Sequence, residues 1–292
     1  MDRRQYIKLM GLSLAGLAMA GFAPCVNSAI GRDRKNPKNR LVFYFTATGN
    51  SLFIARQLSD NLVSIPQELK KGDLAYTADE IGFVFPDYAS SAPMIVREFL
   101  SKAKFNAPYM FSVITYGNAH VNVSEWWNNF AAEKGVKFNY IKPILMVDNY
   151  LPVFDMNEQM TLDKHLDENL AAIINDLSEK KNYIQPSEMG FFSQQMLEGM
   201  QNEHFSHTAQ DLIKIDDNKC IQCMTCAKVC PHNNFSISGG KLTASASKCE
   251  YCLACIQNCP QKALSLERER NKDARYRNPN ISVNDIINSN RQ

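Results

Sequence analysis

Short apolar runs alternate with amphipathic segments along residues 41–181. Runs of apolar residues predict strands over residues 41–45, 64–69, 80–85, 110–115 and 136–146. Apolar positions three or four residues apart predict helices over residues 51–62, 93–102, 124–133 and 157–180. This alternation predicts an α/β fold with a doubly wound sheet of five parallel strands. Ligands bind such sheets beyond the carboxyl ends of the strands.

The pattern changes twice after residue 181. Residues 182–211 are polar and show no sustained period, which predicts a solvated connector. Residues 212–266 contain eight of the nine cysteines and predict a small separate domain, and residues 267–292 form a charged tail with a short helix over residues 281–287. His204 and His207 in the connector are a candidate metal contact, but two histidines alone do not complete a metal site.

The chain of 292 residues is long enough for about two domains, each with a hydrophobic core. Its net charge of +2 is close to neutral, and no basic stripe is interleaved with aromatic residues. A nucleic-acid partner is therefore not expected.

Residues 1–30 are predicted to be a targeting segment rather than part of the fold. Arg3, Arg4 and Lys8 precede an uncharged stretch from residue 9 to residue 31. This arrangement resembles a twin-arginine export signal, with Asp2 as a departure from the family pattern. The resemblance implies the twin-arginine export machinery as a partner and a location in the periplasm or on the outer face of the cytoplasmic membrane. An uncleaved membrane anchor is the alternative, because the uncharged stretch approaches the roughly 20 residues that span a bilayer.

One cysteine spacing occurs twice near the C-terminus: C-x-x-C-x-x-C-x-x-x-C-P begins at Cys220 and again at Cys249. A [4Fe–4S] cluster needs four thiolates, and such runs supply three from a short loop and one from a more distant position. Structural zinc sites usually use two C-x-x-C pairs separated by a longer stretch, so zinc and disulfides are the less favoured interpretations. The ninth cysteine, Cys25, lies in the N-terminal segment, where the preceding Pro24 departs from a lipoprotein signal.

Residues 212–266 resemble a bacterial two-cluster ferredoxin domain, which has a small α+β fold. The resemblance implies two [4Fe–4S] clusters, in which the fourth cysteine of each run ligates the other cluster. One cluster is then held by Cys220, Cys223, Cys226 and Cys259, and the other by Cys249, Cys252, Cys255 and Cys230. Thiolate clusters are best assembled in a reducing compartment, so export of the folded protein agrees with the signal.

The segment after the first predicted strand is rich in hydroxyl groups and opens the first predicted helix. Its residues Thr46, Thr48, Gly49, Asn50 and Ser51 are placed to wrap a phosphate with backbone N–H groups, hydroxyls and a helix N-terminus. The same residue types also occur as helix caps and in turns. Within a wound sheet the loop resembles the FMN phosphate loop of flavodoxins. The sequence lacks the rival signatures G-x-G-x-x-G and G-x-x-x-x-G-K-[ST].

Two further loops follow the third and fourth predicted strands, and they resemble the loops that contact the flavin ring in flavodoxin-like proteins. The first contributes Pro86 and Tyr88, and the second contributes Thr115, Tyr116 and Gly117. Tyr88 and Tyr116 are candidates for stacking on the ring, and packing of a loop against the sheet is the equal alternative.

The order of a flavodoxin-like FMN-binding domain at residues 41–181, a connector, a two-cluster ferredoxin domain and a tail resembles the EFR1-type flavodoxin-ferredoxin fusion proteins. The resemblance implies a protein that passes electrons between FMN and two [4Fe–4S] clusters, with a redox protein or a small acceptor as partner. The alternatives are an FMN-dependent reductase of a small substrate and a module whose clusters are structural. The sequence offers no convincing acid–base pair, so no catalytic residue is assigned, and Asp87 and His120 are the candidates to test.

Overall fold

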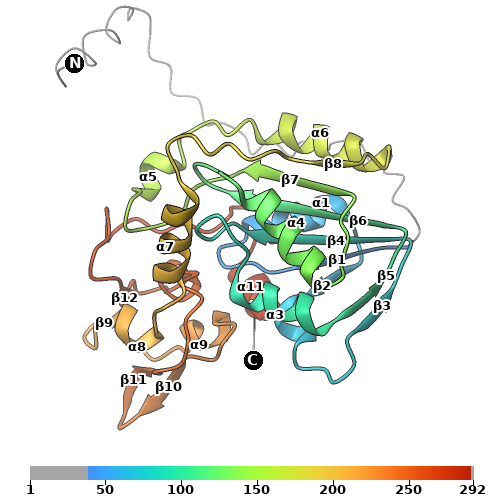
Figure 1. The fold of residues 1–292 in the computed structure, drawn as a ribbon. Coiled ribbons are helices and arrows are strands. Elements are labelled where there is room, and N and C mark those ends of the chain that lie inside the picture. Colours follow the sequence, from blue (N-terminus) through green and yellow to red (C-terminus); the bar gives the residue numbers. More distant parts are fainter. Residues whose placement is uncertain (1–38, 291–292) are drawn as a thin grey trace, which may run out of the picture. The chain divides into compact units, whose positions relative to one another are not determined.

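The computed structural model describes residues 39–290, and six of its strands form one parallel sheet in the order β2-β1-β4-β6-β7-β8 (Figure 1). The strands are β1 (Arg40–Tyr44), β2 (Leu62–Ser64), β4 (Glu80–Pro86), β6 (Tyr109–Tyr116), β7 (Tyr140–Leu145) and β8 (Tyr183–Ile184). In the register of the central strands, Leu41 pairs with Ile81, and Ile81 pairs with Met110. The predicted α/β class is confirmed.

Helices cover both faces of this sheet, and Figure 1 shows α4 in front of the strands and α1 behind them. The helices of this part are α1 (Asn50–Leu58), α2 (Ile65–Glu68), α3 (Met94–Lys102), α4 (Val123–Glu133), α5 (Met156–Gln159) and α6 (Leu166–Ser178). Because helices lie on both faces, central strands β4 and β6 are buried along nearly their whole length. Trp127 of α4 belongs to this core. A separate pair of short parallel strands, β3 (Ala75–Thr77) and β5 (Lys104–Asn106), lies apart from the main sheet.

Several predicted elements differ in the structure. The helix predicted at residues 51–62 ends at Leu58, and Leu62 already belongs to β2. The strand predicted at residues 64–69 ends at Ser64, and α2 begins there, because Ser64 caps the helix by accepting a hydrogen bond from the Gln67 N–H and Pro66 fits its first turn. The helix predicted at residues 157–180 is divided into α5 and α6, and His165, with a φ of 48°, precedes the second of them.

The connector contains regular secondary structure, although most of its side chains are exposed or half-buried, as a solvated segment would be. Tyr183 pairs with Tyr140, so β8 adds a sixth strand to the predicted five, and two residues are too few to give a sequence period. Helices α7 (Gln194–His204) and α8 (Ala209–Leu212) follow.

Near the C-terminus lies a small α+β domain with its own core. It contains β9 (Lys214–Ile215) paired with β12 (Leu264–Ser265), the hairpin of β10 (Phe235–Ser238) and β11 (Lys241–Ala244), and helices α9 (Thr225–Val229) and α10 (Ala254–Gln257). Each helix follows a residue with a left-handed backbone, Met224 with φ 59° and Leu253 with φ 60°. The two cysteine runs therefore fold as structural repeats of each other.

The tail returns to the sheet through α11 (Val283–Asn290), so the helix predicted at residues 281–287 is present and shifted. The Tyr44 hydroxyl lies 2.9 Å from the Ser289 hydroxyl, and the guanidinium of Arg56 pairs with Asp285 at 2.5 Å. Within residues 39–290, no helix combines the length and the apolar character needed to cross a membrane. The predicted export signal lies outside the described residues.

Candidate functional site

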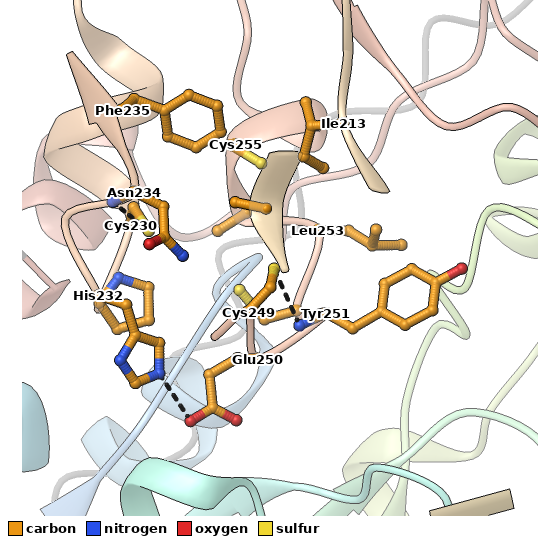
Figure 2. A pocket seen from close by; sticks show the side chains of 14 residues that line it. Ile213, Cys230, His232, Asn234, Phe235, Cys249, Glu250, Tyr251, Leu253 and Cys255 are labelled. Carbon is orange, nitrogen blue, oxygen red and sulfur yellow. Dashed lines mark hydrogen bonds and ion pairs between the residues drawn. The ribbon is translucent and has the colours of Figure 1, made fainter. Parts of the chain in front are cut away.

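Four cysteines, one from the first run and three from the second, line one small cavity in the C-terminal domain. They are Cys230, Cys249, Cys252 and Cys255. Figure 2 shows Cys255 between Phe235 and Ile213, which contribute apolar walls, and Cys249 next to Tyr251. Backbone N–H groups of Asn234 and Tyr251 donate to the sulfur atoms of Cys230 and Cys249, both at 3.4 Å.

The other four cysteines line a second cavity: Cys220, Cys223, Cys226 and Cys259. The N–H of Ala263 donates to the Cys259 sulfur at 3.3 Å. The fold therefore brings together the same two sets that the ferredoxin resemblance implies. Within the second set, Cys223 is exposed while Cys226 is buried, so this site lies near the surface.

The chemistry of both donor sets fits an iron–sulfur cluster. Burial raises the pKa of Cys226 and that of Cys249 to about 12, because their thiolates would carry charge in an apolar cavity. A bound metal reverses this preference and deprotonates its thiol ligands. The backbone N–H groups that point at sulfur then stabilise the thiolates that the cavity alone disfavours.

A larger cavity of about 430 Å³ lies at the carboxyl ends of β1, β4, β6 and β7. Nine of the ten predicted cofactor-binding residues line it: Thr46, Thr48, Asn50, Ser51, Pro86, Tyr88, Thr115, Tyr116 and Gly117. The volume is typical of a site for one small organic ligand. The tenth residue, Gly49, is not part of the lining.

Gly49 faces the C-terminal tail instead of the cavity. Its φ of 101° is left-handed, and a Cβ atom built on it would lie 2.9 Å from the Cβ of Ile281. The tail also satisfies the loop backbone, because the N–H of Asn278 donates to the Thr48 carbonyl at 2.8 Å. Glycine is needed here because the tail packs directly on the loop.

The side chain of Asn50 holds the loop in place. Its Oδ1 accepts from the Tyr276 hydroxyl at 2.6 Å and from the Asn278 amide at 3.2 Å, and its Nδ2 donates to the Val147 carbonyl at 3.2 Å. Asn50 is therefore a positioning residue for the loop. Sequence reasoning did not assign Tyr276 or Asn278 a role, because their contacts with Asn50 join residues more than 220 positions apart.

The hydroxyl groups of the loop are arranged around the cavity. Thr48 Oγ1 accepts from the Asn149 amide at 2.8 Å, and the Ser51 hydroxyl lies 2.8 Å from that of Thr115. Thr46 Oγ1 accepts from the Gly49 N–H at 3.1 Å, so it shapes the turn before α1.

Asp87 places an unpartnered acceptor beside the cavity. Its Oδ1 is shielded from solvent and has no hydrogen-bond partner among residues 39–290. Burial raises the pKa of Asp87 well above its usual range, and the nearby Asp148 adds to the effect. Burial also raises the pKa of Asp148, which follows β7 and lines the same cavity. A ligand N–H group would satisfy this oxygen, as the edge of a flavin ring can.

The two tyrosine candidates line the cavity in different surroundings. Tyr88 packs on His204, with ring centroids 5.2 Å apart, and Tyr116 meets His120 edge-on at 5.2 Å. His120 itself does not line the cavity, and its Nε2 lies 3.5 Å from a Glu188 oxygen.

His204 is part of the cavity wall rather than a ligand in a polar loop. Its ring stacks on Tyr251 at 5.1 Å, and its Nε2 lies 3.1 Å from the Glu250 carbonyl oxygen. Burial lowers the pKa of His204 to about 4, so the ring is neutral at pH 7. His207 meets Tyr251 edge-on at 5.5 Å, so both histidines pack on this tyrosine.

The large cavity and the first cysteine cavity share one wall. Tyr251, Cys252 and Leu253 line both cavities. Figure 2 shows Tyr251 and Leu253 on one side of this cysteine cavity and His232 on the other.

Glu250 joins the cysteine loop to helix α3, which packs on the parallel sheet. Its buried carboxylate accepts from the N–H groups of Met94 and Ile95 at 2.9 and 2.7 Å, and it lies 3.0 Å from His232 Nε2 (Figure 2). Those N–H groups open α3, where a carboxylate is favoured by the helix dipole. Sequence reasoning missed Glu250, because a single acidic residue between two cysteines gives no long-range signal.

Comparison with known proteins bears on the C-terminal domain. Residues 212–260 match the family of 4Fe-4S dicluster domains, so this part of the chain is an iron–sulfur domain. No curated protein matches the chain. A crystal structure of a candidate flavoprotein from Bacteroides uniformis is 16% identical and covers 36% of this chain and 89% of that chain, with a TM-score of 0.27. A similarity at that score carries no argument about this protein.

Proposed function

We propose that this protein carries electrons between FMN and two [4Fe–4S] clusters. The observation that carries the proposal is the shared wall of Tyr251, Cys252 and Leu253, which lines both the large cavity and a four-cysteine cavity. A cysteine that ligates one cluster would thus border the flavin site directly. The dicluster match of residues 212–260 supports the cluster half of the proposal.

The two cysteine sets would have different places in the electron path. The set of Cys230, Cys249, Cys252 and Cys255 would hold the cluster next to FMN. The set of Cys220, Cys223, Cys226 and Cys259 would hold the outer cluster, whose exposed Cys223 supports electron exchange at the surface. The three redox centres would then follow one another in the order FMN, inner cluster, outer cluster.

Residues of three loops would hold FMN. Thr48, Ser51 and the N–H groups at the start of α1 would contact the phosphate, and Tyr88 and Tyr116 would flank the ring. The unpartnered Oδ1 of Asp87 supports a ring edge with an N–H group at that position. Bound flavin exchanges one or two electrons, whereas a cubane cluster normally exchanges one.

A reductase of a small substrate is a second candidate function. The observation that favours it is the same Asp87, because a buried carboxyl group with a raised pKa keeps its proton at higher pH and can donate it. No reductase substrate class follows from the cavity alone.

We also propose that the chain is an exported fusion protein of the EFR1 type, with the domain limits given above. Arg3, Arg4 and Lys8 before an uncharged stretch support twin-arginine export. The domain order supports the family assignment, and an uncleaved anchor is the alternative to release of the signal.

The first test is the cofactor content of the purified protein. We expect about one FMN and about eight iron atoms per chain, with a visible spectrum that contains both chromophores. The order of centres is tested with Cys255→Ala and the matched Cys226→Ala, each of which should remove one cluster. Loss of the cluster beside the shared wall should stop electron transfer between the remaining cluster and the flavin, while loss of the outer cluster should leave transfer from the inner cluster intact. A protein without flavin after reconstitution with FMN would contradict the proposal.

A further inference from the structure

Two segments around the mouth of the large cavity share an unusual composition. We call them the docking surface and define it as residues 153–163 and 188–204. Both segments contribute to the cavity lining, the first through Val153 and Phe154 and the second through Phe192, Met200 and Glu203. Figure 1 shows α5 and α7, which belong to these segments, on the side toward which the arrow of β7 points.

Most of the exposed large apolar side chains of the described residues lie on the docking surface. Six of the eight belong to it: Val153, Met160, Leu162, Phe191, Met196 and Met200. Phe191 is 79% exposed and stacks on Phe192 with ring centroids 4.2 Å apart. Exposed apolar side chains gathered around a cavity mouth indicate an interaction site.

The docking surface carries a net negative charge, although Lys164, directly after its first segment, donates to Gln159 at 3.2 Å. Its two segments contain six carboxylates and no lysine or arginine: Asp155, Glu158, Asp163, Glu188, Glu198 and Glu203. All of them except Asp155 are exposed. Such a surface repels an anionic membrane, and it repels a second copy of itself. It attracts a partner with a basic face.

We propose that the docking surface binds a basic one-electron carrier protein. The inference rests on the proposed function, because a carrier bound here would lie beside the cavity assigned to FMN. Carboxylates at the rim would steer the carrier toward this face, and the apolar side chains would make the close contact once it arrives. Methionine suits such a contact, because its flexible side chain adapts to different partner surfaces.

The first experiment measures binding of the cofactor-loaded protein to two probes of opposite charge, a basic c-type cytochrome and an acidic plant-type ferredoxin. We expect the cytochrome to bind at an ionic strength of about 0.01 M and at least tenfold more weakly at about 0.15 M, because the Debye length falls from about 30 to about 8 Å. The acidic ferredoxin should bind more weakly at both salt concentrations. Equal or tighter binding of the acidic probe would overturn the proposal.

A charge-reversal pair separates a specific surface from general attraction. Glu158→Lys with Glu198→Lys changes the docking surface, and Glu133→Lys with Glu179→Lys makes the same change in net charge at the C-terminal ends of α4 and α6. Those helix ends precede β7 and β8, so they lie toward the amino ends of the strands, away from the cavity. The first pair should weaken cytochrome binding about tenfold and the control pair less than twofold. Equal losses would mean that the cytochrome is held by net charge only.

An apolar pair tests the position of the site. Phe191→Ser should weaken cytochrome binding at both salt concentrations, since it removes apolar contact and no charge. Ile221→Ser is the matched control, because Ile221 is 62% exposed in the loop of the outer cysteine set. If Ile221→Ser weakens binding and Phe191→Ser does not, the carrier docks at the outer set and the proposal is wrong. The flavin content of the same preparation is measured independently of binding. A protein without flavin would reject the proposed function, whereas the binding measurements alone decide whether the docking surface binds a basic carrier.

Discussion

Gly49→Ala tests the contact between the cofactor loop and the C-terminal tail. The added Cβ would lie 2.9 Å from the Cβ of Ile281 and 3.0 Å from that of Asn278, closer than packed carbon atoms normally approach. Both neighbours are buried, and the N–H of Asn278 donates to Thr48. The tail can therefore make room only by moving away from the loop.

The expected loss of stability has two parts. An alanine with a φ near 101° costs about 1–3 kcal/mol in backbone strain. Movement of the tail weakens the bonds from Tyr276 to Asn50 and from Asn278 to Thr48, each worth about 0.5–1.5 kcal/mol. The free energy of unfolding should fall by about 2–6 kcal/mol, and the unfolding midpoint by roughly 5–20 °C. FMN affinity should fall as well, because the same loop lines the cavity.

Gly135→Ala is the matched control. Gly135 also has a left-handed backbone, with a φ of 76°, but a Cβ there has no neighbour within 4 Å. Gly135→Ala therefore introduces the same kind of backbone strain without a steric clash. The assays are the thermal unfolding midpoint and a fluorescence titration with FMN on both variants. If Gly49→Ala is no more destabilising than Gly135→Ala and binds FMN like the unmodified protein, the tail does not hold the loop.

Three further predictions concern the cluster ligands, Asp87 and the N-terminal segment. Cys230→Ala should remove about half of the iron, and electron paramagnetic resonance of the reduced variant should show that the lost cluster is the one ligated by Cys249, Cys252 and Cys255; loss of the other cluster would reject the crossed arrangement. Burial raises the pKa of Asp87, so the folded protein keeps this proton at pH values above about 4, where the unfolded chain releases it. The contribution of Asp87 to stability is therefore lost as pH rises through that window. The difference in unfolding midpoint between Asp87→Asn and the unmodified protein should increase in favour of the variant above pH about 4. A difference that stays constant with pH would contradict the assignment. Replacing Arg3 and Arg4 together by lysine should leave cofactor-loaded precursor in the cytoplasm, because twin-arginine export distinguishes guanidinium from ammonium groups. Cell fractionation measures this, and unchanged export of the variant would point to another pathway.

Local sequence patterns predicted the central strands of the parallel sheet and three ligands of each cysteine set, while the fourth ligand of each set came from the resemblance to ferredoxins. Buried strands such as β4 and β6 read as continuous apolar runs because helices cover both of their faces. The cluster ligands could be predicted because three cysteines of each set lie within seven residues, so their spacing indicates that they share one loop. The loop after β1 was readable because one strand end and one helix start enclose it.

Features that depend on distant contacts were decided by the tertiary structure. Strand β8 has two residues, and only its pairing with β7 makes it a strand. His204 of the polar connector lines the large cavity because its ring packs on both Tyr88 and Tyr251, which lie far apart in the sequence. Asn50 is a positioning residue because Tyr276 reaches it from 226 positions along the chain. A local sequence pattern indicates which side chains of one helix or strand are buried. The hydrogen-bond partner of a buried polar group depends instead on which distant segment the folded backbone brings within hydrogen-bond distance.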